Sequence, residues 1–335
     1  MSKILLLVFV VSTVGFSQAL VQNDTSINNL VHAPGYQVNE LDAIPSYRKI
    51  GRGKIAMIII PGLGFDGSIF DDFTQRNKKQ FTMYVVTLAG FGTTEAPPMP
   101  PTATSYGEQT WSKSAARGIV KLIENEKLIR PIVVGHFVTG SQIAIRLALT
   151  SPTQIGGLIV LGGSGKMMAI VQGKVREATA ADMAKGTDTY WAPKWFKHMT
   201  KQFYDNGNFA PEVYSLEPNT ATVLWNQVAS VPMPVSVRYA CEYYAGDMLA
   251  EIDKLNCPML VVRPSFNDSF WKNEMNKNWI QPQFIESWNI AAKKNPTIQI
   301  VDIAQSAAFV WKDNPEATYQ AITKFVQDSY QVNSH

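Results

Sequence analysis

Residues 131–140 read PIVVGHFVTG, and the chain continues as SQIAIRLAL over residues 141–149. The segment begins with an uninterrupted apolar run, which is typical of a strand buried on both faces of a parallel sheet. Gly135 and Gly140 then bracket a tight turn, and apolar residues at helical spacing follow. The segment therefore predicts a strand, a sharp turn and a helix.

The same alternation of strands and helices extends in both directions from this segment. Helices are predicted over residues 106–126 and 315–329. Apolar runs bounded by turn residues predict further strands over residues 54–60, 81–88, 158–161, 258–262 and 298–303. Strands that alternate with helices indicate an α/β fold with a doubly wound, mostly parallel sheet.

One long segment interrupts this alternation. Residues 166–234 contain no clear strand but many aromatic and methionine side chains, and they predict a helical lid inserted between two strands. The aromatic content favours core packing over a ligand-binding role for these rings. The predicted organisation is a first part of the core over residues 20–165, the lid over residues 166–235, and a second part of the core over residues 236–335.

The N-terminus has the pattern of a secretory signal. Lys3 precedes an apolar run that begins at Ile4 and ends at Val14, and small residues lead up to Ala19. The run is shorter than the ~20 residues that span a bilayer, which disfavours a membrane anchor. We therefore expect residues 1–19 to be removed near Ala19 and the mature protein to be exported, to the periplasm or the medium.

Composition and motifs exclude several classes of function. The net charge of +3, without a basic cluster, gives no reason to expect a nucleic-acid partner. No later run is long enough to span a membrane stably. The chain has no phosphate-binding glycine motif and no HExxH motif, so we predict neither a cofactor nor a metal. Cys241 and Cys257 could pair in an oxidising compartment or remain free.

The strand, turn and helix at residues 131–149 resemble the nucleophile elbow of the α/β-hydrolase fold superfamily, in its esterase- and lipase-like form with a Gly-His-Ser elbow. Matching from the strand places Phe137 where that family has its serine. Matching backwards from Gly140 places Val138 there instead. Neither side chain has a lone pair that could attack a carbonyl, so the nucleophile is substituted in both alignments.

The resemblance also implies an oxyanion hole. The sequence IIIPGLG, residues 58–64, is similar to the strand and loop that supply one of its two backbone donors. By this match the N–H groups of Leu63 and Val138 are the donors. Backbone groups do not depend on the identity of the side chain, so this part of the machinery is expected to remain.

The acid and the histidine of a catalytic triad are expected after later strands. Asp268 follows the strand at residues 258–262 and is the candidate acid, with a solvated loop aspartate as the alternative. The family's histidine falls at Ala308, within the sequence SAAF at residues 306–309. A serine nucleophile needs an imidazole to take up its proton, so the predicted loss of the base matters more than the loss of the hydroxyl.

Two functions are compatible with these features. The first is a hydrolytically impaired, esterase-like protein that keeps an apolar pocket under the lid, lined by Leu63, Phe137 and Phe309. The resemblance implies a small apolar ester, lactone or acyl compound as its ligand. The second is an active carboxylic-ester hydrolase with a rearranged nucleophile and base.

The rearranged site would draw on a small set of residues. Thr139 or Ser141 would be the nucleophile, with His198 of the predicted lid as the base and Asp268 as the acid. Ser141 also suits an N-cap, because its hydroxyl can accept a hydrogen bond from a free backbone N–H. His136 lies directly before the elbow residue and is predicted to be structural.

Overall fold

A computed structural model of the protein describes residues 44–195 and 211–331. The predicted signal peptide and His198 lie outside these ranges. The strands are β1 (Ser46–Ile50), β2 (Ile55–Ile60), β3 (Phe81–Thr87), β4 (Ile132–His136), β5 (Gly157–Leu161), β6 (Ala169–Val171), β7 (Lys174–Arg176), β8 (Met259–Pro264) and β9 (Ile298–Ile303). The longer helices are α2 (Asp71–Asn77), α3 (Thr110–Asn125), α4 (Thr139–Thr150), α5 (Ala180–Gly186), α7 (Pro218–Ala229), α8 (Met233–Ala245), α10 (Ser287–Lys294) and α12 (Pro315–Gln331).

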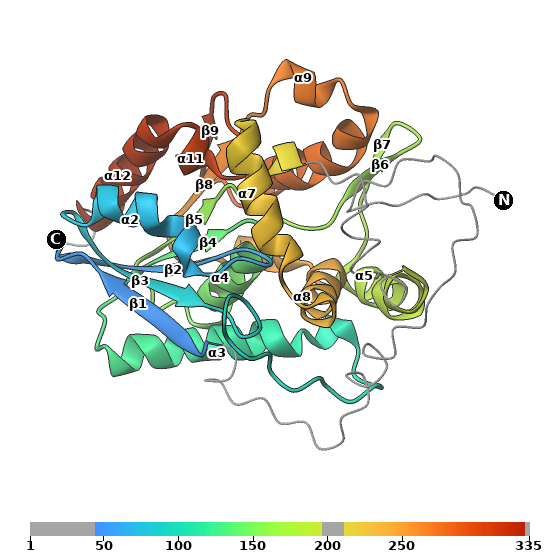
Figure 1. The fold of residues 1–335 in the computed structure, drawn as a ribbon, viewed down its shortest axis with the longest axis horizontal. Coiled ribbons are helices and arrows are strands. Elements are labelled where there is room, and N and C mark those ends of the chain that lie inside the picture. The colour runs from blue at the N-terminus through green and yellow to red at the C-terminus, as the bar shows by residue number, and fades with distance from the viewer. Residues whose placement is uncertain (1–43, 196–210, 332–335) are drawn as a thin grey trace.

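The central sheet has seven strands in the order β1-β3-β2-β4-β5-β8-β9 (Figure 1). β1 pairs antiparallel with β3, and all other neighbours are parallel. Every residue of β4 and β5 is buried, as expected for strands that read as continuous apolar runs. The predicted doubly wound, mostly parallel α/β sheet is confirmed.

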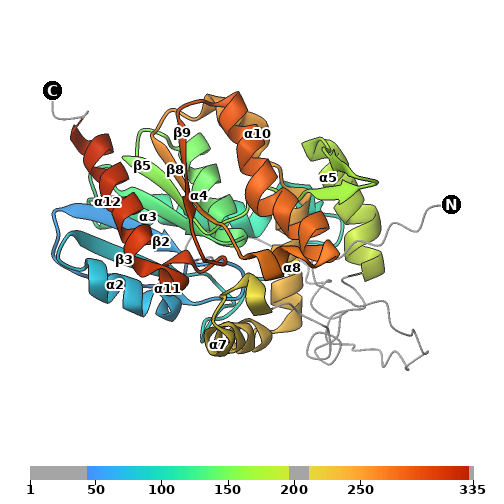
Figure 2. The same cartoon turned by 90° about the horizontal axis from the view of Figure 1, so that it is seen from above.

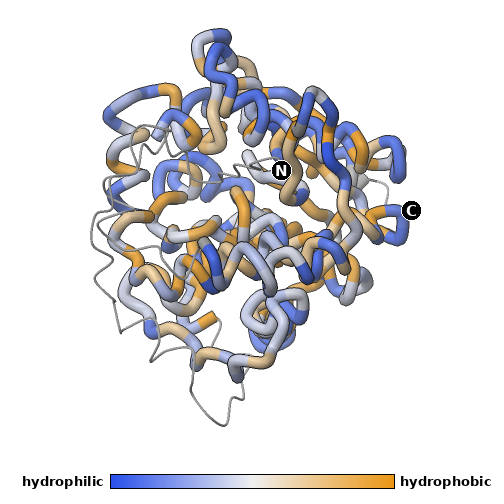
Figure 3. The backbone as a smooth tube through the Cα atoms, turned by 90° about the vertical axis from the view of Figure 1, so that its right-hand side faces the viewer, coloured by the Kyte–Doolittle hydropathy of each residue, from blue (hydrophilic) through white to orange (hydrophobic). Residues whose placement is uncertain are grey.

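Helices cover both faces of this sheet. Figure 2 shows α2 and α12 on one face and α3, α4 and α10 on the other. In Figure 3 the hydrophilic stretches lie mostly on the outer turns, whereas hydrophobic stretches gather toward the middle. α3 illustrates the pattern, because its apolar residues recur at helical spacing and are buried against the core.

Two strand features were not predicted. β1 is an edge strand with the sequence SYRKI, of which only Ile50 is partly buried, so it carries no apolar run to reveal it. The short β6–β7 hairpin lies inside the segment that was expected to lack strands, and that expectation was wrong. Both strands of the hairpin are three residues long, and all three residues of β7 are exposed.

The segment inserted between β5 and β8 is otherwise mostly helical. It contains α5, the π-helix η4 (Thr187–Trp195), η6 (Pro211–Val213), α7, α8 and η7 (Met248–Lys254). The loops after β2 and β3 run directly beneath it, because a Cβ added at Gly64 would lie 3.0 Å from Val228 and one at Gly90 would lie 2.5 Å from Val235. The inserted helices therefore stand over the carboxyl ends of the strands. The predicted domain boundary at residue 235 falls within α8.

α8 is anchored to the core by a buried carboxylate. Glu242 is fully buried and accepts hydrogen bonds from Trp111 N at 3.0 Å and Ser112 N at 2.8 Å, at the start of α3. It also pairs with Arg238 one turn earlier on α8, with 2.9 Å between Nη2 and Oε1. A carboxylate at a helix N-terminus satisfies free N–H groups and complements the helix dipole. α8 is therefore held to α3 by polar contacts as well as by packing.

The structure settles the state of the two cysteines. Cys241 in α8 and Cys257 before β8 are both buried and both free. Burial raises the pKa of the Cys257 thiol to about 11 and that of Cys241 further still. Within residues 44–195 and 211–331, no helix is both long and apolar enough to cross a bilayer.

Candidate functional site

The turn between β4 and α4 is sharp and strained. β4 ends at His136, α4 begins at Thr139, and Phe137 has a φ of +56°. For a bulky side chain this left-handed conformation is a genuine outlier, because Cβ crowds the backbone. Val138 has ordinary right-handed values, with φ −84° and ψ −74°. The strained residue of the turn is therefore Phe137.

Glycines allow this turn to fit against its neighbours. A Cβ added at Gly140 would lie 2.3 Å from the carbonyl oxygen of Ile60, and one at Gly135 would lie 2.5 Å from that of Gly140. Neither clash could be relieved by a flexible side chain, since both partners are backbone.

Ser141 is not the N-cap that its sequence position suggested. α4 begins two residues earlier, and the Ser141 hydroxyl donates back to Gly135 O at 3.5 Å.

Around the turn lies a group of buried rings that we call the aromatic cluster, comprising Phe65, His136, Phe137, Tyr214, Phe284 and Phe309. The Phe137 ring lies 5.5 Å from Tyr214, 5.8 Å from Phe284 and 6.4 Å from Phe65, measured between ring centroids. Phe65 in turn contacts Phe309 edge-on at 4.9 Å. These spacings are within the range of favourable aromatic pairs. The side chain at the turn is thus part of a hydrophobic core.

His136 serves the cluster as a neutral ring. Its Nδ1 accepts a hydrogen bond from Gly62 N at 3.3 Å, which leaves the proton on Nε2. Nε2 is buried and has no hydrogen-bond partner among the described residues, and the centroids of the edge-on Phe309 and Trp311 rings lie 4.5 and 4.9 Å from that of the imidazole. Burial, helped by the charge of Lys312, holds the pKa of His136 well below its usual range. The imidazole therefore stays uncharged at neutral pH, as expected for a structural histidine.

Ala308 lies in the loop between β9 and α11 (Val310–Asp313) and is fully buried. Its N–H donates to Val213 O at 3.0 Å, and the next N–H, of Phe309, donates to Tyr214 O at 2.9 Å. This loop therefore bonds to the inserted segment just before α7. A Cβ at Gly162 would lie 1.7 Å from Ala308 O, and one at Gly163 would lie 2.9 Å from Phe137 O. Two consecutive glycines after β5 thus bring this loop and the turn together.

A carboxylate that sequence reasoning did not single out fixes the same loop. Asp313 Oδ2 accepts hydrogen bonds from Ala307 N at 2.7 Å and from Leu216 N at 3.1 Å. The Ser215 hydroxyl donates to Oδ1 of the same side chain. Asp313 thus joins the Ala308 loop to the segment that leads into α7.

The two predicted oxyanion-hole donors follow residues that are in contact. A Cβ added at Gly62 would lie 2.5 Å from the Cβ of Phe137, so the loop after β2 packs against the turn after β4. Leu63 and Val138, the next residues of these two segments, are both buried, and neither backbone N–H donates a hydrogen bond to any other part of residues 44–195 or 211–331. Backbone N–H groups that are not otherwise bonded can bind a carbonyl or carboxylate oxygen.

Asp268, the predicted acid, forms no hydrogen bond with the turn after β4 through its carboxylate. It is exposed at the first position of the short helix α9 (Asp268–Trp271), and Asn267 supplies the cap by accepting from Phe270 N at 2.8 Å. Among the described residues no hydrogen bond or ion pair to the Asp268 carboxylate is present. Its position agrees with the solvated aspartate that was the alternative interpretation.

The nearest buried polar network follows β5. Ser164 N donates to Phe137 O at 3.2 Å, and the Ser164 hydroxyl lies 2.8 Å from the Tyr243 hydroxyl. Tyr243 also donates to Gln283 Oε1 at 3.1 Å. Burial raises the pKa of Tyr243 above its ordinary value, so the phenol stays protonated at neutral pH. The described residues hold no group of three or more side chains suited to a metal ion.

Comparison with known proteins adds a further finding. No family model and no curated protein matches the sequence, but solved structures match the fold. An esterase from Exiguobacterium antarcticum has a TM-score of 0.62 at 15% identity, covering 85% of this chain and 98% of that chain. A hydrolase from Pseudomonas aeruginosa gives 0.60 at 15% identity, over 84% and 93%. An enol-lactonase from Burkholderia xenovorans gives 0.59 at 13%, over 84% and 96%.

This chain has the α/β-hydrolase fold. Identity this low supports the fold alone, so the chemistry of the site must be argued from this chain's own residues. In this α/β-hydrolase fold, the turn after β4 and the loop after β9 meet at the carboxyl edge of the sheet, where ligands bind in open α/β sheets.

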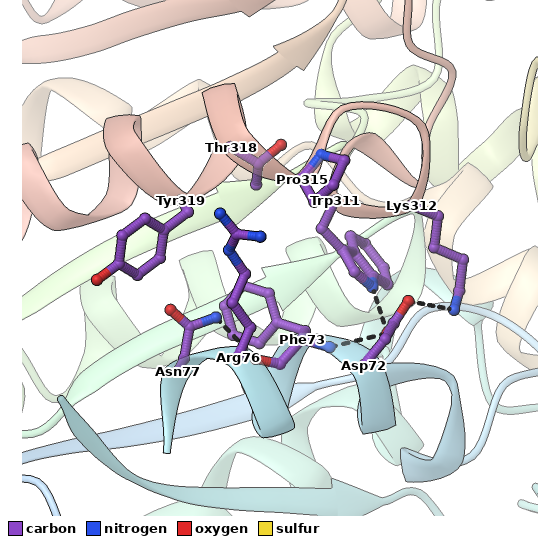
Figure 4. A pocket seen from close by; sticks show the side chains of 9 residues that line it. All are labelled: Asp72, Phe73, Arg76, Asn77, Trp311, Lys312, Pro315, Thr318 and Tyr319. Carbon is purple, nitrogen blue, oxygen red and sulfur yellow. Dashed lines mark hydrogen bonds and ion pairs between the residues drawn. The ribbon is translucent and has the colours of Figure 1, made fainter. Parts of the chain in front are cut away.

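A surface cavity of about 220 Å³ lies between α2, α11 and α12 (Figure 4). Trp311 lines it and also stacks on Phe70 at 4.5 Å. The cavity's Asp72 carboxylate accepts from Trp311 Nε1 at 3.3 Å and from Lys312 Nζ at 2.9 Å. Its charges are therefore already paired, because Arg76 also forms an ion pair, with Glu316, and no residue of the aromatic cluster lines it.

Proposed function

We propose that this protein is an exported, ligand-binding member of the α/β-hydrolase fold that does not hydrolyse its ligand. The observation that carries the proposal is the residue at the strained turn. Phe137 has the left-handed backbone of a nucleophile elbow, yet its ring packs against Phe65, Tyr214 and Phe284. A benzyl group offers no lone pair for attack on a carbonyl.

The position matched to the base is substituted as well. Ala308 occupies the position proposed for the histidine, and its surroundings are fully buried. His136 is the only histidine in residues 44–195 and 211–331, and its Nδ1 is already bonded to Gly62 N. A relocated hydroxyl would keep its proton if it met no imidazole, and the described residues offer none that is free to face the turn.

The ligand is proposed to be a small apolar ester, lactone or acyl compound. The N–H groups of Leu63 and Val138, which bond to no other described residue, support the binding of a carbonyl oxygen, and the surrounding rings, with Phe137 and Phe309, support an apolar body. Similar structures include an esterase and an enol-lactonase, which is consistent with this class. The inserted segment, with α7 and α8 above the loops after β2 and β3, is proposed as the lid.

The second candidate is an active hydrolase with a rearranged site, and the geometry gives it less support. Thr139 and Ser141 are fully buried, and the Thr139 hydroxyl has no partner among the described residues. Ser164 has a partner in Tyr243, but the pKa of that tyrosine is raised by burial, so the phenol is protonated at neutral pH and cannot take up the proton of the serine. Asp268 is exposed on α9.

A covalent probe separates the two candidates. We expect a fluorophosphonate, which labels activated serines, to leave the native protein unlabelled while labelling an active serine esterase in the same reaction. A p-nitrophenyl butyrate sample incubated with the protein should be recovered intact. Labelling that disappears in Ser141→Ala or in Ser164→Ala would establish an active serine and contradict the proposal. N-terminal sequencing of secreted protein tests export, with a start near residue 20 expected.

A further inference from the structure

A separate cavity lies within the inserted segment, between the β6–β7 hairpin, α5, η4 and α8, and the short π-helix η8 (Asn276–Ile280) also borders it. Its volume is about 140 Å³. None of its lining residues belongs to the turn after β4 or to the aromatic cluster. Binding of a ligand in this cavity is therefore independent of the proposed function.

The walls of this cavity are apolar and adaptable. Met167 follows β5, Met183 comes from α5, and the rings of Trp191 and Trp279 close two further sides. Methionine side chains are unbranched and polarizable, so they adjust to apolar ligands of different shape. Concave sites lined by such groups, with a few polar atoms at defined places, are typical of small-molecule binding.

One charged side chain stands at this cavity with free donors. Arg176, on β7, is exposed, and its guanidinium makes no hydrogen bond or ion pair anywhere in the described part of the chain. The carboxylate of Asp182, which also lines the cavity, is occupied by Thr179, whose hydroxyl donates to it at 2.7 Å as part of a capping box. The planar guanidinium is suited to hold a carboxylate by two parallel hydrogen bonds.

We propose that this cavity binds a short apolar monocarboxylate, with its apolar part between Met167, Met183 and Trp279 and its carboxylate on Arg176. The size of the cavity supports a short occupant, since sites for drug-sized ligands begin at ~300 Å³. The charge of Arg176 selects the anion over a neutral molecule of the same length. The Asp182 carboxylate is held by the Thr179 hydroxyl and forms no hydrogen bond to Arg176, so the donors of the guanidinium are available to the ligand.

The test compares octanoate with 1-octanol on the purified full chain, by calorimetry and by tryptophan fluorescence. We expect octanoate to bind and Arg176→Gln to weaken it roughly tenfold, the scale of one lost charge-assisted hydrogen bond. The same change should leave the weaker binding of 1-octanol unaltered. Arg52→Gln is the matched control, because Arg52 is also exposed and unpaired among the described residues but lies elsewhere.

A second variant tests the location. A Cβ at Gly186, which lines the cavity, meets nothing within 4 Å, so Gly186→Phe adds a ring without disturbing the backbone. This variant should lose binding of both probes. The proposal is overturned if octanoate fails to bind, if Arg52→Gln weakens it as much as Arg176→Gln, or if Gly186→Phe binds octanoate as the native protein does.

Discussion

The strained turn makes a prediction about the sign of a stability difference. Phe137 has a φ of +56°, whereas Val138 next to it has a φ of −84°. We consider alanine and glycine at each position. At residue 137 the glycine variant should be more stable than the alanine variant, and at residue 138 the order should reverse.

The magnitudes decide this outcome. A residue with a Cβ in the left-handed region costs ~1–2 kcal/mol, which Phe137→Ala retains and Phe137→Gly escapes. Glycine loses roughly 0.4–1 kcal/mol more entropy on folding. Phe137→Gly should therefore be more stable than Phe137→Ala by about 0.5–1 kcal/mol. Both variants should be less stable than the native protein by ~3–5 kcal/mol, because the buried ring is removed. Val138 has right-handed values, so only the entropy acts and Val138→Ala is favoured by a similar amount.

Urea denaturation followed by circular dichroism measures all four variants against the native protein. Comparing glycine with alanine at one position cancels most of the cost of the lost side chain. If Phe137→Gly is less stable than Phe137→Ala, residue 137 is not left-handed. If instead the reversal occurs at residue 138, the alternative alignment of the turn is correct.

Three further results are expected. Glu242→Gln should lower the free energy of unfolding measured in urea by ~3–5 kcal/mol, because it leaves the buried Arg238 cation without its carboxylate. In the control Glu124→Gln, at an exposed ion pair, the change should be less than ~0.5 kcal/mol. In the unfolded chain His136 is protonated near pH 6.5, whereas in the folded chain burial depresses its pKa and the ring stays neutral. The free energy of unfolding should therefore fall below pH 6.5, by up to ~1.4 kcal/mol per pH unit. His136→Asn should remove this pH dependence. Cys241 and Cys257 should react with a thiol reagent only after denaturation, and a melting temperature that drops on adding reductant would show that they are paired.

The sheet was predictable because its central strands are buried on both faces and read as apolar runs. β2, β3, β4, β5, β8 and β9 all lie where those runs predicted them. β1 and the β6–β7 hairpin were missed because their residues are mostly exposed and carry no such pattern. Edge and surface strands are specified by their partners more than by their own residues.

The site was predictable only in part. The glycines around Phe137 revealed the turn, since the backbone there has no room for a Cβ. Nothing in the sequence indicated that Tyr214 and Phe284, far along the chain, would pack on that ring. Asp313 was likewise missed, because its three partners come from two segments that only the fold brings together.

Under the proposed function, Phe137 and Ala308 are the two residues that prevent ester hydrolysis at this turn. A serine at position 137 together with a histidine at position 308 should therefore be sufficient to restore acyl chemistry there. The direct measurement is p-nitrophenyl butyrate hydrolysis by Phe137→Ser combined with Ala308→His, beside each single variant and the native protein. Because nucleophile and base act as a unit, the double variant should hydrolyse the ester above background while the other three do not. A folded double variant that stays inert toward several esters, or a native protein that already turns them over, would contradict the account.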